Sequence, residues 1–493
     1  MAAKRAELTP DAAALVDARN GRCWTFSEVN HAANAIAHGL ARLGLSRGDR
    51  LAVLCLNRVE FFVTLFACQK AGVIMAPLNW RQPVAELAQV AQGVGVAALA
   101  FDDDHRDTGR ALAERLGAMP IAMDDPQAGE AGLSALMQSD GPPLSDRIDA
   151  SAPWYVLFTS GTTGLPKAVI QTPRMSWANA LNIAQAIDLT ARDTSVNFLP
   201  LFHTGGINLY TLPLFLFGGA STVVPRFEPD TILDLIAQGA VTQFFGVPAI
   251  FQAFSLHGRV GEIDWASIRM ACGGAPLPEH LIGFFAERGA LICNGFGMTE
   301  TGPTAFLMDP AHVRAKIGSV GKAQMLTQVR LDAVAEGEPG EGELQLRGPA
   351  ITPGYFGDAE ATARALTADG WLRSGDVARR DSDGYYYIVD RIKDMYISGG
   401  ENVYPAEVER VLNTHEAIVE AAVVGVPDAR WGEIGAAFLI VRPGRSLDVT
   451  TLDAWCRERL AAYKVPGSFR ILDDFPRTAA GKVRKPTLRA LLQ

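Results

Sequence analysis

The sequence predicts an α/β protein with a large N-terminal domain of doubly wound α/β layers and a small barrel-like β part, followed by a small mobile α+β domain. Three observations support this fold class. The chain has 493 residues, more than the roughly 250–300 that one hydrophobic core organises. Short apolar strands alternate with helical stretches over residues 24–308, as in doubly wound layers. Turn-rich strands follow, and the last segment mixes helices and strands.

The alternation of strands and helices is clearest over residues 24–224, and a second unit of the same pattern covers residues 230–308. Residues 25–28, Thr-Phe-Ser-Glu, have the pattern of a capping box and therefore predict a helix start. Residues 127–149 are rich in Gly, Pro, Ser and Asp, which indicates a surface connection. The first predicted elements are helices over residues 26–43 and 59–71 and strands over residues 50–56 and 73–77.

The C-terminal third changes character twice. Residues 318–388 contain short strands separated by Gly, Pro and Asp, which indicates an antiparallel, barrel-like piece. After residue 391 the pattern becomes that of a small α+β domain of about a hundred residues. Its predicted elements are helices over residues 405–413 and 452–460 and strands over residues 418–426 and 435–441.

The composition indicates a soluble, cytoplasmic enzyme. Hydrophobic residues make up 48% and charged residues 20% of the chain, which is ordinary for a globular enzyme. The net charge of −9 argues against general binding to nucleic acid or anionic membranes. The six cysteines form no Cys-x-x-Cys pair, which favours reduced thiols over a disulfide frame or a zinc site.

Two further patterns concern targeting and membranes. The first residues carry charge where a signal peptide requires an apolar core. The most apolar window, residues 205–224, contains Asn208, Pro213 and a Gly-Gly turn, so we interpret it as a buried helix or strand–helix unit rather than a membrane span.

The strongest functional signal is the sequence Thr-Ser-Gly-Thr-Thr-Gly-Leu-Pro-Lys at residues 159–167, directly after an apolar strand. Glycines turn backbone N–H groups toward an anion, hydroxyls add donors and lysine adds charge, so the segment predicts a polyphosphate cradle. It differs from the usual P-loop, because Pro166 precedes the lysine and Ala168 follows it. A solvated turn is the weaker alternative. The candidate phosphate contacts are Thr159, Ser160, Gly161, Thr162, Thr163, Gly164 and Lys167.

A second candidate segment is Gly-Phe-Gly-Met-Thr-Glu-Thr at residues 295–301, after an apolar strand. Glycines beside an aromatic residue allow a flat ring to approach, and Glu300 offers a hard oxygen ligand for magnesium. A plain turn with a surface acid is an equal alternative for the segment alone. Beside a phosphate cradle the magnesium role is favoured, because the metal must neutralise a triphosphate.

Four other positions are ambiguous from composition alone. Asp376 follows Gly375 and could accept two ribose hydroxyls, although a turn-capping aspartate is the commoner case. Lys482 lies beyond a small-residue loop and could be only part of a basic surface tail. His203 is as compatible with a buried structural histidine as with a pocket gate. The glycine-rich loop at residues 398–402 could let a thin ligand pass.

Taken together and in this order, these segments resemble the adenylate-forming enzymes, which comprise acyl-CoA synthetases, luciferases and the adenylation domains of peptide synthetases. The resemblance covers residues 8–492. It is nearest to the bacterial acyl- and feruloyl-CoA ligases, and residues 390–409 and 426–433 carry that likeness. Two positions depart from the family pattern: Phe296 replaces a usual Tyr, and Ala168 replaces a common Gly.

The resemblance implies an AMP-binding domain over residues 1–392 and a swinging domain over residues 393–493, with the hinge at Lys393. It implies ATP, Mg²⁺ and coenzyme A as ligands. In the family pattern Lys482 is the adenylation lysine, Glu300 lies near magnesium, His203 guards the carboxylate pocket, and Arg391 contacts ribose or phosphate. The other implied nucleotide contacts are Gly274, Ala275, Pro276, Asn294, Gly295, Phe296, Gly297, Met298, Thr299 and Asp376, and the implied CoA contacts are Ser398, Gly399, Gly400, Glu401 and Asn402.

The implied activity is that of an ATP-dependent acyl-CoA synthetase. It would convert a carboxylic acid to acyl-AMP with release of pyrophosphate and then transfer the acyl group to CoA. One alternative is an adenylation enzyme that loads a carrier protein; it is less favoured because no carrier domain follows Lys482 and no acid occupies residues 244–248. A nucleotide-binding regulator without chemistry is a third possibility, and it does not explain Lys482 together with Glu300.

The segments expected to line the acyl pocket predict the substrate class. They contain no arginine or lysine to pair with a second carboxylate, so a buried dicarboxylate would be costly. We therefore expect a hydrophobic monocarboxylate, with an aryl acid of the hydroxycinnamate type ahead of a medium- or long-chain fatty acid. The sequence leaves the oligomeric state open, with a homodimer as one option. The lining segments are residues 202–208, 244–251, 272–275 and 294–297.

Overall fold

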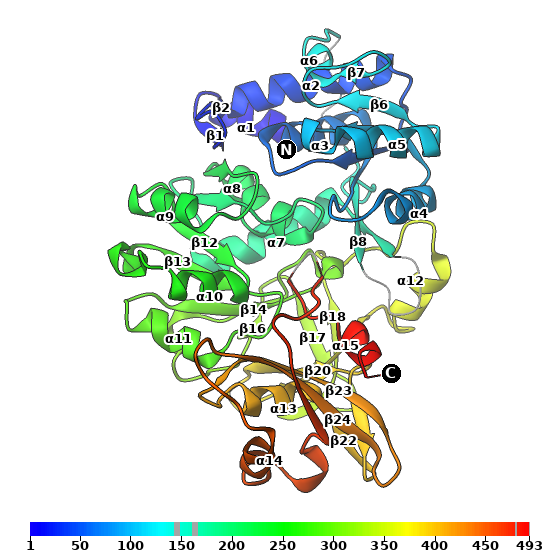
Figure 1. Ribbon diagram of the computed structural model, residues 1–493. Coiled ribbons are helices and arrows are strands. Elements are labelled where there is room, and N and C mark those ends of the chain that lie inside the picture. Colours follow the sequence, from blue (N-terminus) through cyan, green and yellow to red (C-terminus); the bar gives the residue numbers. More distant parts are fainter. Residues whose placement is uncertain (142–147, 160–165, 479–480, 493) are drawn as a thin grey trace. The chain divides into compact units, whose positions relative to one another are not determined.

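The computed structural model (Figure 1) describes residues 1–141, 148–159, 166–478 and 481–492. The chain divides into two compact units. The first comprises Met1–Ala315, Ala323–Gln328 and Leu346–Leu372, and the second comprises Lys316–Lys322, Val329–Gln345 and Arg373–Gln493. Both units mix helices and strands, and the first is the larger, which confirms the predicted α/β class with a large N-terminal part.

A seven-stranded sheet in the order β7-β6-β5-β3-β4-β8-β9 is the first layer of unit 1. Its pairings are parallel from β7 to β8, and β9 is antiparallel to β8. The strands are β3 (Arg50–Leu54), β4 (Ile74–Pro77), β5 (Val96–Phe101), β6 (Met119–Ala122), β7 (Ala131–Gly132), β8 (Tyr155–Thr159) and β9 (Lys167–Gln171), with helices α2 (Phe26–Arg42), α3 (Val59–Ala71), α4 (Val84–Val94), α5 (Arg106–Leu116) and α6 (Leu133–Leu136).

Local sequence explains where the first helices begin and what they bury. The side chain of Thr25 accepts a hydrogen bond from the Glu28 N–H and Glu28 returns one to the Thr25 N–H, so the predicted capping box is present. Helix α3 is apolar on all sides and lies buried, as its Phe61, Phe62 and Phe66 side chains show. Its bounds equal the predicted range of residues 59–71.

A four-stranded sheet in the order β10-β11-β1-β2 forms a second layer of unit 1. The apolar window at residues 205–224 forms a π-helical turn, a short helix and a strand of this sheet, as predicted. Among the described residues, no helix is long and apolar enough to cross a membrane. The elements are α1 (Ala2–Leu8), β1 (Ala13–Asp17), β2 (Cys23–Thr25), α7 (Pro173–Ile187), β10 (Thr194–Asn197), η2 (Gly205–Leu209), α8 (Thr211–Phe217) and β11 (Ala220–Val223).

The third sheet has the order β12-β13-β14-β15-β16. In its three parallel strands Phe245, Ala271 and Cys293 are register partners and so share one face. Phe244, one residue before Phe245, packs with Phe251 and Phe254 instead. The elements are α9 (Pro229–Ala237), β12 (Gln243–Gly246), α10 (Pro248–Leu256), β13 (Arg269–Cys272), α11 (Glu279–Ala286), β14 (Ile292–Phe296), β15 (Phe306–Leu307) and β16 (Lys322–Ala323).

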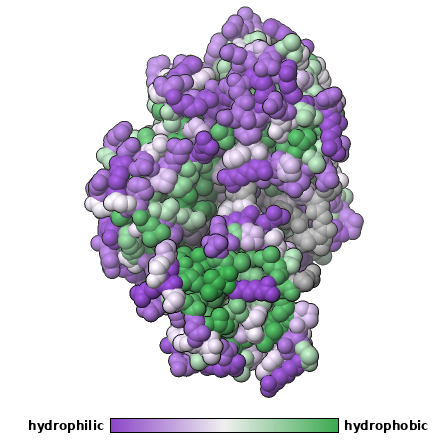
Figure 2. Space-filling model, in the orientation of Figure 1, coloured by the Kyte–Doolittle hydropathy of each residue, from purple (hydrophilic) through white to green (hydrophobic). Residues whose placement is uncertain are grey.

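The second unit contains two sheets. In one sheet the strands lie in the order of the sequence, β17-β18-β19-β20, and a barrel-like piece was predicted for this region. In the other sheet the order is β22-β21-β24-β23, and β25 pairs with β24. Figure 2 shows apolar surface in the region of the second sheet, where Val426, Ile440 and Leu472 are only partly buried. The strands are β17 (Gln328–Leu331), β18 (Gly340–Arg347), β19 (Leu372–Arg380), β20 (Tyr386–Arg391), β21 (Tyr396–Ser398), β22 (Glu401–Val403), β23 (Ile418–Asp428), β24 (Gly432–Val441) and β25 (Ser468–Ile471).

The remaining helical elements are short. Helix α14 starts and ends three residues earlier than predicted, because Asp448 caps its start by accepting from the N–H groups of Thr450 and Thr451. The α-helices are α12 (Ala359–Ala365), α13 (Pro405–Leu412), α14 (Val449–Arg457) and α15 (Lys485–Ala490); the 3₁₀ turns are η1 (Asp103–His105), η3 (Val260–Glu262), η4 (Trp265–Ser267), η5 (Thr299–Thr301), η6 (Pro310–His312) and η7 (Ala462–Lys464).

The expected surface connection at residues 127–149 is wrong in part. Its residues include strand β7 and helix α6, and both Leu133 and Leu136 are buried. A Cβ atom on Gly39 of α2 would come within 2.8 Å of Leu136 Cδ2, so α6 lies directly on α2. The apolar residues at i and i+3 spacing form one helix face, which the polar composition of the surrounding residues conceals.

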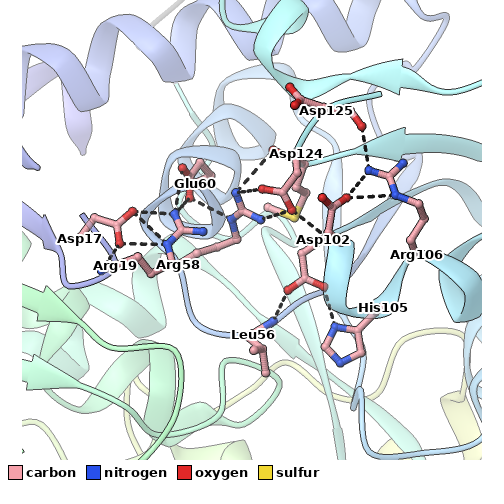
Figure 3. A network of polar contacts seen from close by, with 12 residues as sticks. Asp17, Arg19, Leu56, Arg58, Glu60, Asp102, His105, Arg106, Asp124 and Asp125 are labelled. Carbon is pink, nitrogen blue, oxygen red and sulfur yellow. Dashed lines mark hydrogen bonds and ion pairs between the residues drawn. The ribbon is translucent and has the colours of Figure 1, made fainter. Parts of the chain in front are cut away.

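A network of partly buried ion pairs, with Arg58 and Asp17 as its buried members, connects the two N-terminal sheets of unit 1 (Figure 3). Arg58, at the start of α3, donates to Asp124 after β6 at 2.8 Å and to Glu60 at 2.9 Å. Arg19 bridges Glu60 to Asp17 at the end of β1. Burial raises the pKa of the Asp124 carboxyl, but the bonds and charge of Arg58 outweigh it, so the pKa lies below its ordinary value. The network therefore keeps buried charges paired where three segments meet.

Candidate active site

The predicted phosphate loop connects two paired strands. Thr159 at the end of β8 is the register partner of Lys167 at the start of β9, and the Thr159 hydroxyl donates to the Lys167 carbonyl at 3.5 Å. The hairpin therefore holds both ends of the loop at the edge of the sheet. Five predicted contacts lie outside the described residues: Ser160, Gly161, Thr162, Thr163 and Gly164.

Tyr355 links Lys167 to Glu300. The Lys167 ammonium lies 4.8 Å from the centre of the Tyr355 ring, within the range of a cation–π contact. The Tyr355 hydroxyl donates to Glu300 Oε1 at 3.0 Å. Burial, followed by the negative charge of Glu300, raises the pKa of Tyr355, so the phenol stays protonated and remains a donor. Lys167 of the predicted phosphate loop and Glu300, the predicted metal ligand, thus both contact Tyr355.

Hydrogen bonds from strand β9 and from Thr352 hold the backbone around Glu300. Gln171 of β9 donates to the Thr299 carbonyl at 2.9 Å, and the Thr352 N–H donates to the Glu300 carbonyl at 2.9 Å. The Glu300 side chain is buried, with 6% of the residue exposed. Glu300 is therefore positioned beside the base of the phosphate loop.

The donor set fits magnesium bound together with phosphate. The described residues contain no group of three or more His, Cys, Asp and Glu side chains that could hold a metal by themselves. Magnesium usually takes one or two protein carboxylates and completes its octahedron with substrate phosphates and water. A single buried carboxylate next to a phosphate loop meets that requirement.

The strand ends after β13 and β14 carry the predicted adenine and acyl contacts. Gly274, with φ +84°, is exposed together with Ala275 and Pro276 beyond β13. Ligands of open parallel sheets bind outside the carboxyl ends of the strands, where these residues lie. Asn294 is buried, and the residues from Gly295 to Thr299 are partly exposed. The predicted contacts within or just beyond β14 are Asn294, Gly295, Phe296, Gly297, Met298 and Thr299.

The two glycines of this segment have a packing function. A Cβ atom on Gly297 would lie 1.4 Å from the Pro303 carbonyl oxygen, and one on Gly295 would lie 2.9 Å from the Phe306 carbonyl oxygen. The close approach of residues 303–306 therefore excludes side chains at both positions. This packing requirement is sufficient to explain both glycines. The reason expected from the sequence was different, namely the approach of a flat ligand ring.

His203 lies in a turn that follows β10. Its ring centroid is 4.7 Å from that of Phe202, which is 6.2 Å from Trp80, and Trp80 is 5.6 Å from His105. Gly206 permits the turn, because a Cβ there would be 2.4 Å from the Pro200 carbonyl oxygen. Trp80 was missed by the sequence analysis, although it follows β4 at the carboxyl edge where such residues are expected.

In the second unit, the structure brings together Asp376, Arg391, Lys393 and Lys482. Asp376 of β19 and Arg391 of β20 are register partners, with Arg391 Nε 3.4 Å from Asp376 Oδ1. Burial raises the pKa of the Asp376 carboxyl, while the charges of Arg391, Lys482 and Lys393 act in the opposite direction. A buried carboxylate surrounded by cations is suited to accept hydroxyl hydrogen bonds.

Two hydrogen bonds with Thr478 hold the Lys482 backbone. Its N–H donates to the Thr478 hydroxyl at 3.1 Å, and the Thr478 N–H donates to the Lys482 carbonyl at 2.7 Å. Three residues later, Lys485 pairs with Glu409 of α13 at 2.8 Å. This ion pair anchors the C-terminal segment to the second unit and so supports the loop that carries Lys482.

The glycine-rich loop at residues 398–402 is a tight β-hairpin. Ser398 ends β21, Glu401 begins β22, and the two residues form a register pair. Gly399 and Gly400 have φ values of +61° and +88°, as a two-residue type I′ turn requires. The turn by itself explains the two glycines. Glu401 and Asn402 are exposed.

Comparisons with known proteins agree with this geometry. The family described as AMP-binding enzyme matches residues 2–356, and its C-terminal domain matches residues 407–482. A feruloyl-CoA synthase from an Amycolatopsis species is 40% identical over 493 residues, covering 99% of this chain and 97% of that protein. A long-chain-fatty-acid–CoA ligase from Mycobacterium tuberculosis is 33% identical over 499 residues, with 99% and 97% covered.

Solved structures of o-succinylbenzoate CoA synthetase from Bacillus subtilis have the same fold. The complex with the acyl-adenylate intermediate gives a TM-score of 0.88 at 30% identity, covering 99% of this chain and 97% of that one. The complex with ATP and magnesium gives a TM-score of 0.87 at 30% identity, with 99% and 98% covered. Fold and site thus define an enzyme class that activates carboxylates with ATP. The chain belongs to the AMP-binding enzyme family and is an AMP-forming acyl-CoA synthetase.

Proposed function

We propose that this enzyme activates a hydroxycinnamate-type aryl acid and transfers it to coenzyme A. The observation that carries the proposal is the 40% identity to a feruloyl-CoA synthase over 99% of the chain. The candidate acyl-pocket segments support it, because they contain no arginine or lysine for a second carboxylate. Fatty-acid and succinylbenzoate ligases are also among the relatives, so the acid itself requires an experiment.

The residues of the first unit divide the work of the adenylation step. Lys167 and the phosphate loop hold the β- and γ-phosphates of ATP, and Tyr355 keeps Lys167 and Glu300 in place. Glu300 is the residue that holds magnesium, which supplies positive charge to the triphosphate when bound. His203 borders the carboxylate pocket. The carboxylate of the acid attacks the α-phosphorus in line, the bond to the β-phosphate oxygen breaks, and pyrophosphate leaves with the electron pair.

The second unit supplies the residues for nucleotide positioning and for the change between half-reactions. Asp376 accepts the ribose hydroxyls, Arg391 contacts ribose or phosphate, and Lys482 bridges the substrate carboxylate and the α-phosphate. In the second step the CoA sulfur attacks the acyl carbonyl and AMP leaves. We place the CoA contacts at Ser398, Gly399, Gly400, Glu401 and Asn402, and the boundary between an AMP-binding domain (1–392) and a swinging domain (393–493) at the hinge Lys393.

The hinge proposal predicts that Lys393→Pro separates the half-reactions. Lys393 lies between β20 and β21, and proline would restrict its φ to about −65° and so oppose a swing. Pyrophosphate exchange should stay near the parent rate, while acyl-CoA formation should fall by at least about tenfold. Both rates are measured on the same preparation. Lys393→Ala is the control, since it removes the same side chain and leaves φ unrestricted; parent-like thioester formation in Lys393→Pro would place the pivot elsewhere.

A substrate panel tests the proposed function directly. Acetate, malonate, octanoate, palmitate, benzoate and ferulate are compared by pyrophosphate release with free CoA present, and the thioester is identified by mass. We expect the highest kcat/KM for ferulate. Malonate or acetate as the best substrate would contradict the pocket argument, and palmitate would assign the enzyme to the fatty-acid ligases. Adenylate formation without transfer to free CoA would instead favour a carrier-loading enzyme.

A further inference from the structure

A small polar cavity lies among β10, the π-helical turn η2 and β12 of the first unit. Its volume is about 10 Å³, close to the space that one water molecule needs. The polar residues that line it are Ser195, Asn197, Tyr210 and Thr211, and Gly205 and Phe245 contribute to its apolar wall. The cavity is therefore sized for a single hydroxyl or water.

Two of the hydroxyl groups that line the cavity are unsatisfied. Ser195 is 2% exposed and Tyr210 is 6% exposed, and neither hydroxyl has a hydrogen-bond partner among the described residues. Buried hydroxyls are normally hydrogen-bonded, because leaving one unpaired is unfavourable. Burial also raises the pKa of the Tyr210 phenol above its ordinary value, so the group stays a neutral donor. Two such groups at one cavity point to a ligand with its own hydroxyl.

The other polar side chains at the cavity, Asn197 and Thr211, already have hydrogen-bond partners. The Asn197 amide donates to the Gly206 carbonyl and to the Thr211 hydroxyl, both at 2.6 Å, and its oxygen accepts from Asn57 at 2.8 Å. Asn197 therefore supports the turn that carries His203 and Gly206. Among the described residues that line the cavity, the hydroxyls without any hydrogen-bond partner are those of Ser195 and Tyr210.

The cavity lies beside segments that we assign to the acyl pocket. Gly205 belongs to residues 202–208 and follows His203 by two positions, and Phe245 belongs to residues 244–251. The Tyr210 and Phe245 ring centroids are 5.9 Å apart with an interplanar angle of 74°, an edge-to-face contact. Phe245 lies in the acyl-pocket segment 244–251, so Tyr210 packs directly against that segment.

We propose that Tyr210 and Ser195 form the polar end of the acyl pocket and bind the phenolic hydroxyl at the far end of an aryl substrate. This inference rests on the proposed function and adds residues that determine specificity. One hydroxyl donates to the substrate oxygen and the other accepts from it. A substrate that lacks the hydroxyl leaves both groups unpaired in a buried site, which is the condition under which an enzyme rejects a deoxy analogue.

The test compares kcat/KM for 4-hydroxycinnamate and cinnamate, two acids that differ by one hydroxyl. We expect the wild-type enzyme to prefer 4-hydroxycinnamate, and Tyr210→Phe to lower that preference about 10- to 100-fold, the effect of one or two hydrogen bonds. Circular dichroism and the thermal midpoint of each variant show that it is folded, so that the ratio of the two substrates reports on the pocket. Ser195→Ala should act in the same direction.

Ser221→Ala is the matched control. Ser221 of β11 is the register partner of Ser195 and is equally buried, but it does not line the cavity. Its substrate ratio should equal that of the wild type. Unchanged ratios in both Tyr210→Phe and Ser195→Ala would overturn the inference and assign the cavity to a bound water, while leaving the proposed function intact. A wild-type enzyme that activates neither aryl acid would overturn the proposed function and this inference together.

Discussion

Replacing Lys482 with alanine is expected to abolish adenylation while sparing thioester transfer. The ammonium is the only group that we assign to bridging the substrate carboxylate and the α-phosphate, and charge accumulates there in the transition state. Loss of one such electrostatic contact lowers a rate by about 10²–10⁴-fold. Pyrophosphate exchange measures the first half-reaction. Synthetic acyl-adenylate plus CoA measures the second, which should proceed near the parent rate.

The structure supplies a control for this experiment. Arg484 is an exposed cation two residues further along the same segment. Arg484→Ala removes a positive charge from the same region and should leave both half-reactions within about twofold, because exposed charges contribute little. Equal loss of both half-reactions in Lys482→Ala would remove Lys482 from the adenylation role.

Replacing Arg58 with methionine is expected to destabilise the first unit strongly. Arg58 is 5% exposed and donates to both Asp124 and Glu60. Its loss removes the arginine partner of Asp124 and one of the two arginines that pair with Glu60. Breaking a buried ion pair costs about 3–5 kcal/mol, and the partial exposure of Asp124 and Glu60 places the expected cost at the lower end of that range. The expected result is a clear fall in the midpoint of the first urea or thermal unfolding transition.

Arg259 offers a matched control on the surface of the same unit. It contacts three carboxylates, Asp230, Asp234 and Glu262, all of them exposed. Arg259→Met also replaces an arginine that has several partners, but water can solvate the released carboxylates, so the midpoint should not change measurably. If Arg58→Met unfolds at the parent midpoint, the network of Figure 3 contributes no net stability.

Local patterns predicted the elements that depend on neighbours in sequence. Helix α3 has the predicted bounds, and the capping box at Thr25 is formed, because both depend on residues within four positions of one another. Helix α6 was not predicted. Its Leu136 packs on Gly39 of α2, and this contact between distant segments stabilises a helix that the local composition does not indicate.

The candidate site likewise contains residues that the sequence identified and residues that only the tertiary structure revealed. Lys167 and Glu300 were selected from the sequence by their chemistry and their flanking residues, and Asp376 and Lys482 by the roles that the family resemblance implies. Tyr355, which contacts two of them, was not selected, because it lies 55 positions from Glu300 in the chain and has no flanking signature. The same reason explains why Trp80 and Tyr210 were missed: each becomes informative only through the rings and cavity beside it.

The sequence by itself determined the α/β class and the family resemblance, since these follow from periodicity and short motifs, and it supplied the candidate nucleotide-binding residues. The tertiary structure alone decided which of those residues share a site and what else is there. It paired Asp376 with Arg391 across two strands, joined Lys167 to Glu300 through Tyr355, and left the Ser195 and Tyr210 hydroxyls at one cavity. Contacts of this kind depend on strand register and on packing between distant segments, which local sequence does not encode.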